Sequence, residues 1–395
     1  MTFESGTERS GLPGWTYFSE RLFELECEEL FRTHWQYICH VSEVAEPGRF
    51  ATLDIGGERG FVIRGEDGAL RGFHNLCRHR GSRVVAAERG VCKRMIVCPF
   101  HGWTYNLDGS LRGVSRPETF PRMSKRHWGL KPLDMEVWNG LVFLRFCPGP
   151  QPSVAEMMAP FEAEVAPYDI AGMVSANSDY SETICANWKA VRDVDNEGYH
   201  VPQAHPALHD LYGQHYFDEP YRDYVSRSAG HFNESEGRHW SVLHYRRILP
   251  CPERLPESHR QLWLYLGLFP NFVLGLYPDS VIHYRELPLS AVSTVQTGGV
   301  FRYRNESREL RLARYLSGRI DRETSEEDRM LTVWAAEATR SSAFEGIILS
   351  DLEAGIRSHH DHLREVLPVL NLDAEPTGMS IAEANRAARK EISAG

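Results

Sequence analysis

The sequence lacks the features of a membrane protein or of a secreted, disulfide-bonded one. No run approaches the roughly 18 consecutive apolar residues that a membrane helix needs. The N-terminus has no basic start, apolar core or small-residue cleavage site, so it does not resemble a signal peptide. Eight cysteines scattered over 395 residues are too sparse for a disulfide framework. We therefore expect a cytoplasmic protein whose cysteines are metal ligands, catalysts or core residues.

An excess of positive charge is also missing. The chain has 44 Lys and Arg against 54 Asp and Glu, a net charge of −10, which argues against a nucleic-acid partner. The content of 42% hydrophobic and 25% charged residues is typical of a soluble protein with sizeable cores. A length of 395 residues predicts two domains.

The first part of the chain changes from a helical to a β pattern. Residues 17–35 have apolar side chains at helical spacing, and Ser19 is a residue type that caps helix N-termini. From residue 36 to about 147, short apolar runs alternate with Gly, Asp and Pro, which predicts a small all-β domain. The dipeptides at Asp67-Gly68 and Asp108-Gly109 indicate hairpin turns.

A boundary follows at residues 147–152, where three prolines and a glycine occur together. Beyond it, helical patterns and apolar strand candidates alternate, and the stretch from about 326 to 366 is helical, which predicts an α+β domain. We expect an N-terminal helical segment (1–35) that packs on the last domain, a β domain (36–150) and an α+β domain (151–395).

Two half-sites in the β domain each pair a cysteine with a histidine. Cys77 and His79 form C-x-H, and after eighteen residues Cys98 and His101 form C-x-x-H. A zinc finger groups two cysteines before two histidines, whereas each half here supplies one of each. This suits a [2Fe–2S] cluster with thiolates on one iron and imidazoles on the other. Structural zinc and two unrelated pairs are the competing interpretations, and Cys92, without a partner histidine, is assigned to packing.

A second constellation lies in the α+β domain. Taken as one helix, the segment places Asp193, Glu197 and His200 on one face. Pro202 would end that helix, and His205 could then turn back beside His200. Two histidines near a carboxylate supply much of a facial triad, the ligand set of non-haem Fe(II) oxygenases. The third ligand would be a carboxylate from elsewhere in the chain.

Other interpretations of the histidines stay open at this point. The chain has 18 histidines, so chance pairing is real, and an ordinary helix end would explain the segment equally well. His205 and His209 form an alternative pair at i and i+4. The sequence HHDH at 359–362 is a further metal-like cluster.

With both constellations in view, the chain resembles the Rieske-type non-haem iron oxygenases, the catalytic (α) subunits of ring-hydroxylating systems. The resemblance is carried by CRHRG (77–81), CPFHGWTYNLDGSL (98–111) and NWK…EGYHVPQAHP (187–206), and it extends over nearly the whole chain. It implies a multidomain α+β protein, in which an all-β Rieske [2Fe–2S] domain precedes an α+β helix-grip (START-like) catalytic domain. It also implies that the cluster is held by Cys77, His79, Cys98 and His101, and a mononuclear Fe(II) by His200 and His205.

The resemblance assigns roles to several carboxylates. Glu197 would be the bridging residue between a cluster histidine of a neighbouring subunit and an iron-ligand histidine, which implies a homotrimer. The third iron ligand would be Asp351 in ILSDLEAG, with Glu345 as the competitor. Asp193 departs from the family pattern and would be a weak extra ligand or a hydrogen-bond partner of the site. Tyr199 would help to orient the ligands.

The family implies a terminal oxygenase that uses O2 and electrons from a separate NAD(P)H-dependent reductase, with or without a ferredoxin. An aromatic compound, in particular an aromatic acid, is the favoured substrate on family frequency, and the product would be a hydroxylated or dihydroxylated ring. The alternative is oxidative N-demethylation of a quaternary ammonium compound of the betaine or carnitine type. An electron-transfer protein without catalysis and a zinc hydrolase are alternatives from other classes.

Overall fold

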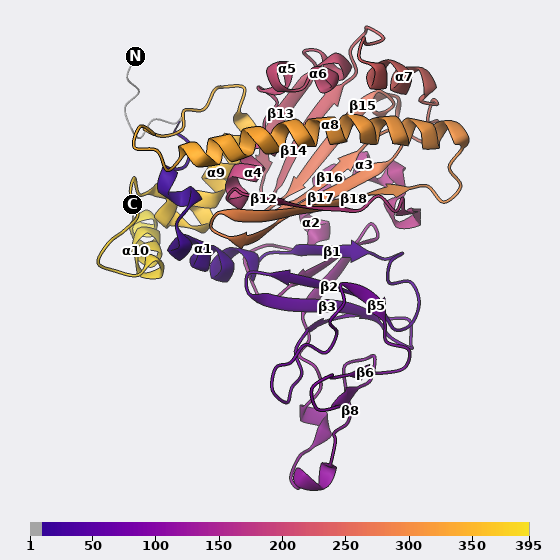
Figure 1. Cartoon of the computed structure of the whole chain (residues 1–395), viewed down its shortest axis with the longest axis vertical. Helices are drawn as coiled ribbons and strands as arrows, with labels where there is room; N and C mark the ends of the chain where they lie inside the picture. The colour runs from indigo at the N-terminus through magenta and orange to yellow at the C-terminus, as the bar shows by residue number, and fades with distance from the viewer. Residues whose placement is uncertain (1–9, 395) are drawn as a thin grey trace. The chain divides into compact units, whose positions relative to one another are not determined.

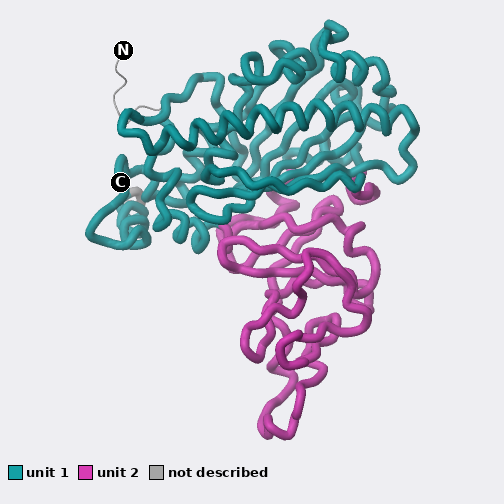
Figure 2. The backbone as a smooth tube through the Cα atoms, viewed as in Figure 1, with its two compact units in different colours: residues 1–30, 160–168, 176–395 teal, residues 31–159, 169–175 magenta. Residues whose placement is uncertain are grey.

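The structure, a computed structural model, describes residues 10–394. The described chain forms two compact units (Figure 2). Unit 1 contains residues 10–30, 160–168 and 176–394, and unit 2 contains residues 31–159 and 169–175. The sequence placed the corresponding boundaries at 35 and 150. No helix among the described residues is both long enough and apolar enough to span a bilayer.

Unit 2 is built from small antiparallel sheets, which confirms the expected all-β class of this region. The strand orders are β4-β3-β2-β5, β1-β10-β9 and β6-β7-β8. A core of aliphatic and aromatic side chains fills the part that contains Cys77 and Cys98. The elements are β1 (Gln36–His40), β2 (Arg49–Ile55), β3 (Glu58–Arg64), β4 (Leu70–His74), β5 (Arg89–Val91), β6 (Ile96–Val97), β7 (Thr104–Tyr105), β8 (Leu111–Gly113), β9 (Asp134–Trp138), β10 (Leu141–Arg145), α2 (Val154–Met158) and β11 (Val174–Ser175).

Both turns expected from Asp-Gly dipeptides are present. Gly68 and Gly109 have φ angles of 78° and 83°, which glycine adopts without steric cost. At Gly109 a Cβ would also lie 2.4 Å from the ring of Phe73, so a side chain there is excluded twice over. The two glycines therefore fix hairpins that the sequence already specified.

Unit 1 is organised around one antiparallel sheet with the strand order β12-β18-β17-β16-β15-β14-β13. The long helix α8 runs across its strands (Figure 1). The elements are α1 (Glu20–Glu26), α3 (Glu162–Val165), β12 (Tyr180–Ile184), α4 (Trp188–Asp195), α5 (Val201–Ala204), α6 (Pro206–Tyr212), β13 (Tyr216–Arg222), β14 (Val225–His231), α7 (Trp240–Ile248), β15 (Leu262–Leu268), β16 (Phe272–Leu276), β17 (Val281–Ser290), β18 (Ser293–Arg302), α8 (Arg308–Ala338), α9 (Ala354–Val366) and α10 (Ile381–Ala394).

The N-terminal helix is shorter than the expected 17–35. Ser19 caps α1, because its side chain accepts a hydrogen bond from the backbone N–H of Leu22. Glu26 is fully buried and accepts hydrogen bonds from Trp188 Nε1 at 2.9 Å and from Lys189 Nζ at 2.5 Å. A buried carboxylate needs such partners, so α1 is tied to α4 within unit 1.

Helix α8 begins much earlier than the expected residue 326. Ser307 caps it by accepting from the backbone N–H of Leu310, and the helix continues without interruption to Ala338. Leu310, Ala313, Ser317 and Ile320 form its buried stripe. A break over residues 339–353 separates it from α9, so the stretch 326–366 contains parts of two helices rather than one.

Candidate metal centres

The two cysteines of unit 2 sit in loops with the same backbone design. The carbonyl of Cys77 accepts from the N–H of Gly81 at 2.9 Å, and that of Cys98 accepts from the N–H of Gly102 at 3.0 Å. The two glycines have φ angles of 73° and 70°, which is why the glycine in each motif matters. These matched turns present Cys77 and Cys98 from two adjacent loops.

The donor atoms of these loops fit a cluster. Both cysteines are free and only 2% exposed, and burial raises the pKa of the Cys77 thiol, so a metal would be needed to hold the thiolate. The rings of His79 and His101 lie 4.7 Å apart, and the Nδ1 atom of each is buried without a hydrogen-bond partner. A buried polar atom left unpaired is what a missing metal bond would explain. The two cysteines interact with each other and the two histidine rings are in contact, so the arrangement is compatible with the predicted cluster ligands.

In unit 1, the segment after α4 leaves the helical path at the point where a site forms. The expected helix to Tyr199 is wrong, because α4 ends at Asp195. A Cβ on Gly198 would lie 1.8 Å from the ring of Tyr216, so only glycine allows the chain to pass there. The one-turn helix α5 then separates His200 from His205, and their Nε2 atoms come to 2.9 Å. The predicted pairing of these two histidines is therefore present, but through a loop and a single turn rather than a helix face.

The third member of the group is Asp328 on α8. Its Oδ1 lies 2.8 Å from His205 Nε2 and 3.4 Å from His200 Nε2, and it has no hydrogen-bond partner of ordinary geometry. Within the described part of the chain, this is the one place where at least three His, Cys, Asp or Glu donors converge closely enough for a single ion. Two imidazoles and one carboxylate form the facial set that suits non-haem iron.

The expectation that Asp351 completes this set is corrected. Its side chain is 72% exposed and pairs with Arg357 at 3.7 Å, in the break before α9. The competitor Glu345 is also exposed in that break. Helical spacing offered one signal for Asp328, because it lies eight residues after Ile320 and so continues the buried stripe of α8. It stands, however, in a stretch of charges that is typical of solvated surface.

A carboxylate also contacts the Nδ1 atom of each histidine, on the side of the ring away from the ion position. Glu197 makes a short hydrogen bond with His200 Nδ1, and Glu327 lies 2.8 Å from His205 Nδ1. When each Nδ1–H donates to a carboxylate, each Nε2 is left with its lone pair directed at the ion position. Glu197 thus contacts His200, and its role as a bridge between subunits stays a prediction. Glu327 was missed, because nothing in its local sequence distinguishes it from its acidic neighbours.

The charges of this group favour a cation. Burial lowers the pKa of His200, but the neighbouring carboxylates of Asp328 and Glu197 outweigh burial and raise the pKa to about 10. Burial raises the pKa of Asp328, yet the two histidines hold it below its ordinary value. Three carboxylates therefore surround two imidazoles, an arrangement whose negative excess a divalent metal would neutralise.

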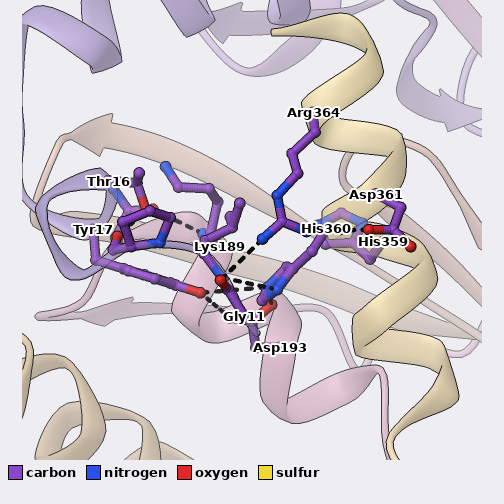
Figure 3. Close-up of polar contacts among 12 residues, drawn as sticks. Gly11, Thr16, Tyr17, Lys189, Asp193, His359, His360, Asp361 and Arg364 are labelled. Carbon is purple, nitrogen blue, oxygen red and sulfur yellow. Dashed lines mark hydrogen bonds and ion pairs between the residues drawn. The ribbon is translucent and has the colours of Figure 1, made fainter. Parts of the chain in front are cut away.

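Asp193 lies in a different network, which corrects its expected role as an extra ligand or partner of the site (Figure 3). It accepts from Tyr17 Oη at 2.6 Å and from His360 Nε2 at 2.9 Å. The backbone N–H of Leu12 donates to His360 Nδ1 at 3.2 Å, so the network fastens the start of the described chain to α4 and α9. The HHDH stretch thus has a structural role here. Tyr199 is 57% exposed and does not line the cavity described next.

A cavity of about 610 Å³ within unit 1 adjoins the histidines and Asp328. Its walls come from the sheet, α4 and α8, and tyrosines dominate its aromatic lining. Besides Asp328, the carboxyl groups that line it are Glu182, Asp195, Glu197, Asp321 and Glu326. Burial raises the pKa of Asp321 to about 7, although Tyr277 Oη donates to it at 2.9 Å. The lining tyrosines are Tyr180, Tyr216, Tyr265, Tyr277, Tyr284 and Tyr315.

Known protein families match both units. Residues 34–124 match the Rieske [2Fe-2S] domain, and residues 166–368 match the ring hydroxylating alpha subunit (catalytic domain). The latter covers more than half of the chain. The chain therefore belongs to the family of ring-hydroxylating oxygenase alpha subunits, whose cofactors are a Rieske cluster and a mononuclear iron. The residues of the two centres fit both groups.

Two oxygenase subunits of known name are similar to this chain in sequence. The glycine betaine monooxygenase oxygenase subunit of Pseudomonas aeruginosa is 37% identical over 199 residues, which are 50% of this chain and 45% of that protein. The match thus spans less than half of that relative. The subunit of the same name from Chromohalobacter salexigens is 28% identical over 408 residues, covering 94% of this chain and 89% of that protein.

Solved structures share the fold. A quaternary ammonium Rieske monooxygenase in complex with L-carnitine has a TM-score of 0.73 at 24% identity, covering 90% of this chain and 94% of the other. Naphthalene 1,2-dioxygenase from Rhodococcus also has a TM-score of 0.73, at 20% identity, covering 93% and 95% of the two chains. Because the fold is equally similar to both, it does not distinguish a quaternary ammonium substrate from an aromatic one.

Proposed function

We propose that this chain is the terminal oxygenase of a multicomponent system that hydroxylates an N-methyl group of a quaternary ammonium compound. The observation that carries the proposal is the tyrosine-lined, carboxylate-bearing cavity that opens onto His200, His205 and Asp328. Tyrosine faces and carboxylates attract a quaternary ammonium ion, which cannot donate a hydrogen bond and is recognised through cation–π contact and charge.

Arginine, which would clamp an aromatic acid, is a weaker feature of the cavity. Two of its lining arginines are already engaged: Arg314 pairs with Glu306 at 2.7 Å and Arg329 pairs with Glu182. The relatives named above act, by name, on glycine betaine, and this too supports the cation. The preference for an aromatic acid is therefore replaced by the quaternary ammonium alternative.

The reaction consumes one O2, two electrons and two protons. One oxygen atom enters a C–H bond of the N-methyl group and the other leaves as water. The N-hydroxymethyl product then loses its C–N bond, giving a tertiary amine, formaldehyde and a proton. When bound, the cluster would deliver electrons and the mononuclear iron would activate dioxygen.

The chain's own residues prepare this chemistry. Glu197 and Glu327 fix the two imidazoles through their Nδ1 atoms, so that the Nε2 atoms and Asp328 leave one side of the ion position open toward the cavity. The apolar and aromatic side chains of the cavity would limit the access of bulk water to that side. Electrons would come from a separate NAD(P)H-dependent reductase, with or without a ferredoxin, and Glu197 would serve as the electron bridge in a homotrimer.

A single-turnover experiment tests the function. The chemically reduced, iron-loaded protein is given oxygen and a mixed panel of N-methylated ammonium compounds and aromatic acids, and products are identified by mass spectrometry. We expect one tertiary amine together with an equal amount of formaldehyde. A hydroxylated ring would instead establish the aromatic alternative.

The matched control is Asp328→Ala, which should keep the cluster signal and give no product. Full turnover by this variant would contradict the assignment of the iron site. A colourless wild-type protein that binds zinc would favour the hydrolase alternative. A cluster that cycles while neither iron nor product is found would favour an electron-transfer protein.

A further inference from the structure

The charge of the chain is distributed very unevenly around the cluster loops. Residues 78–131 contain twelve Lys and Arg against three Asp and Glu, a net charge of +9. Because the whole chain carries −10, the remaining 341 residues carry −19. The segment that surrounds the cluster ligands thus has the opposite sign to the rest of the protein.

Part of this positive charge is held against the cluster loops by packing. We call residues 116–128 the basic loop. Phe120 packs edge-on against His79 at 6.2 Å and against Trp103 at 5.7 Å, and Trp128 packs against Trp103 at 6.1 Å. Ser115, just before the loop, donates a short hydrogen bond to the carbonyl of His101. The loop is therefore anchored beside both histidines.

The basic side chains between these two anchors face solvent, whereas Met123 packs against the core. Arg122, Lys125 and Arg126 are exposed, and among the described residues none of them forms an ion pair with a carboxylate. Glu118 is the single acidic residue of the loop. Uncompensated charges of one sign on one loop produce a positive potential that reaches about 10 Å into solvent at moderate salt.

Arginine and aromatic side chains also pair next to the cluster ligands. The guanidinium of Arg80 lies 5.1 Å from the ring of Phe100, and that of Arg78 lies 5.6 Å from the ring of Trp128. Phe100 is 54% exposed and Trp128 is 37% exposed. The surface beside the cluster is thus polar and positive with single exposed rings, rather than a broad apolar patch.

We propose that the basic loop is the docking surface for an acidic electron-carrier protein that reduces the cluster. This inference rests on the proposed function, which requires an external electron donor. A donor must bind, transfer one electron to the cluster and leave, and short-lived redox complexes use small, polar, charge-complementary interfaces. A permanent contact with a second copy through the basic loop itself would instead call for a larger and more apolar face than this loop offers.

The test compares two charge-reversed proteins that have the same net charge. In the first, Arg122→Glu, Lys125→Glu and Arg126→Glu reverse the basic loop. In the control, Arg308→Glu, Arg386→Glu and Lys390→Glu reverse three exposed bases of unit 1. The probe is a reduced plant-type [2Fe–2S] ferredoxin, which is acidic, and stopped-flow absorbance follows reduction of the cluster in the full-length, cluster-loaded chain at a series of salt concentrations.

We expect the wild-type rate constant to fall steeply as salt rises. The loop variant should be slower by about tenfold or more at low salt, with a much flatter salt dependence, whereas the control should keep most of the wild-type rate. The reduction potential of the cluster is measured in all three proteins, so that a changed driving force is separated from changed docking.

Small charged oxidants test the charge of the same surface independently of protein docking. Ferricyanide, an anion, should oxidise the reduced cluster of the loop variant more slowly than that of the wild type, and hexaammineruthenium(III), a cation, should do so faster. Equal rates in the loop variant and the control would overturn the inference. A loop variant that loses self-association in sedimentation while keeping its ferredoxin rate would also overturn it, in favour of a second copy. Wild-type protein that binds no cluster would overturn the proposed function itself.

Discussion

The cluster site of unit 2 and the triad of unit 1 differ in how far apart their donors lie in the sequence. Cys77, His79, Cys98 and His101 fall within 25 residues, on two loops with matched glycine turns. The triad spans 129 residues from His200 to Asp328. Its two histidines flank a one-turn helix, and Asp328 lies on a long helix that crosses the sheet.

This difference shows what a local motif can encode. In the cluster loops, backbone hydrogen bonds over four residues and two glycines place the ligands, so spacing alone carries the geometry. In the triad, the third donor depends on which face α8 turns toward the sheet. That face is set by packing along the whole helix, which no short motif contains.

The largest effect is expected from removing Asp328, the donor that lies far from the two histidines in the sequence. Asp328→Ala should cost more mononuclear iron than the roughly 10–100-fold affinity loss that follows removal of an outer partner, and it should abolish turnover. Asp351→Ala, which changes an exposed side chain, should keep iron and activity within about twofold. Metal analysis of the purified proteins decides, and the opposite pattern would restore Asp351 as the ligand.

Loss of the cluster in unit 2 should leave the mononuclear iron site of unit 1 intact. Cys98→Ser should abolish the visible absorption and the electron paramagnetic resonance signal of the cluster, because the thiolate is a ligand. Cys92→Ser, which alters a partly buried cysteine outside the motif, should keep both signals. Iron bound at His200 and His205 should be equal in the two variants. Loss of that iron in Cys98→Ser would mean that the sites are not independently built.

A smaller effect is expected from the carboxylate that orients His205. Glu327→Gln should weaken iron binding by about tenfold, because the Nδ1–H of His205 would then donate to a neutral amide rather than to a carboxylate. Glu337→Gln, an exposed change on the same helix, is the matched control. Iron titrations compare the two, and equal affinities would show that Glu327 has no influence on the site.

The smallest effect concerns the acid in the cavity. Burial raises the pKa of Asp321 to about 7, so the folded state favours its protonated form. That stabilisation is complete below the pKa of the unfolded chain and is lost as pH rises through about 7. A shift of this size corresponds to at most about 4 kcal/mol, and less where cavity water reaches the carboxyl group.

Asp321→Asn keeps an acceptor for Tyr277 and cannot ionise. The free energy of unfolding of the variant minus that of the wild type should therefore be larger at pH 8 than at pH 5, so the variant gains relative stability at high pH. Denaturant titrations at both values measure this difference. The same difference at both pH values would show that Asp321 is ionised throughout this range.

Much of the fold followed from local patterns. The Ser19 cap, the Asp-Gly hairpins and the β class of residues 36–147 depend on neighbours in the sequence, and they appear as expected. Helix lengths were less accurate. The end of α4 at Asp195 reflects the close approach of Gly198 to Tyr216, a contact between residues that pattern reasoning does not pair.

The sequence by itself determined the two half-sites of the cluster, the pairing of His200 with His205 and the family to which the chain belongs. Short-range spacing and backbone conformation are sufficient for those features. Tertiary structure alone decided that Asp328 and not Asp351 joins the histidines, that Glu327 orients one of them, and that Asp193 turns away to Tyr17 and His360. The physical reason is that helix faces and long-range contacts are chosen by burial over the whole domain, and a residue's type does not reveal which side of a helix becomes the inside.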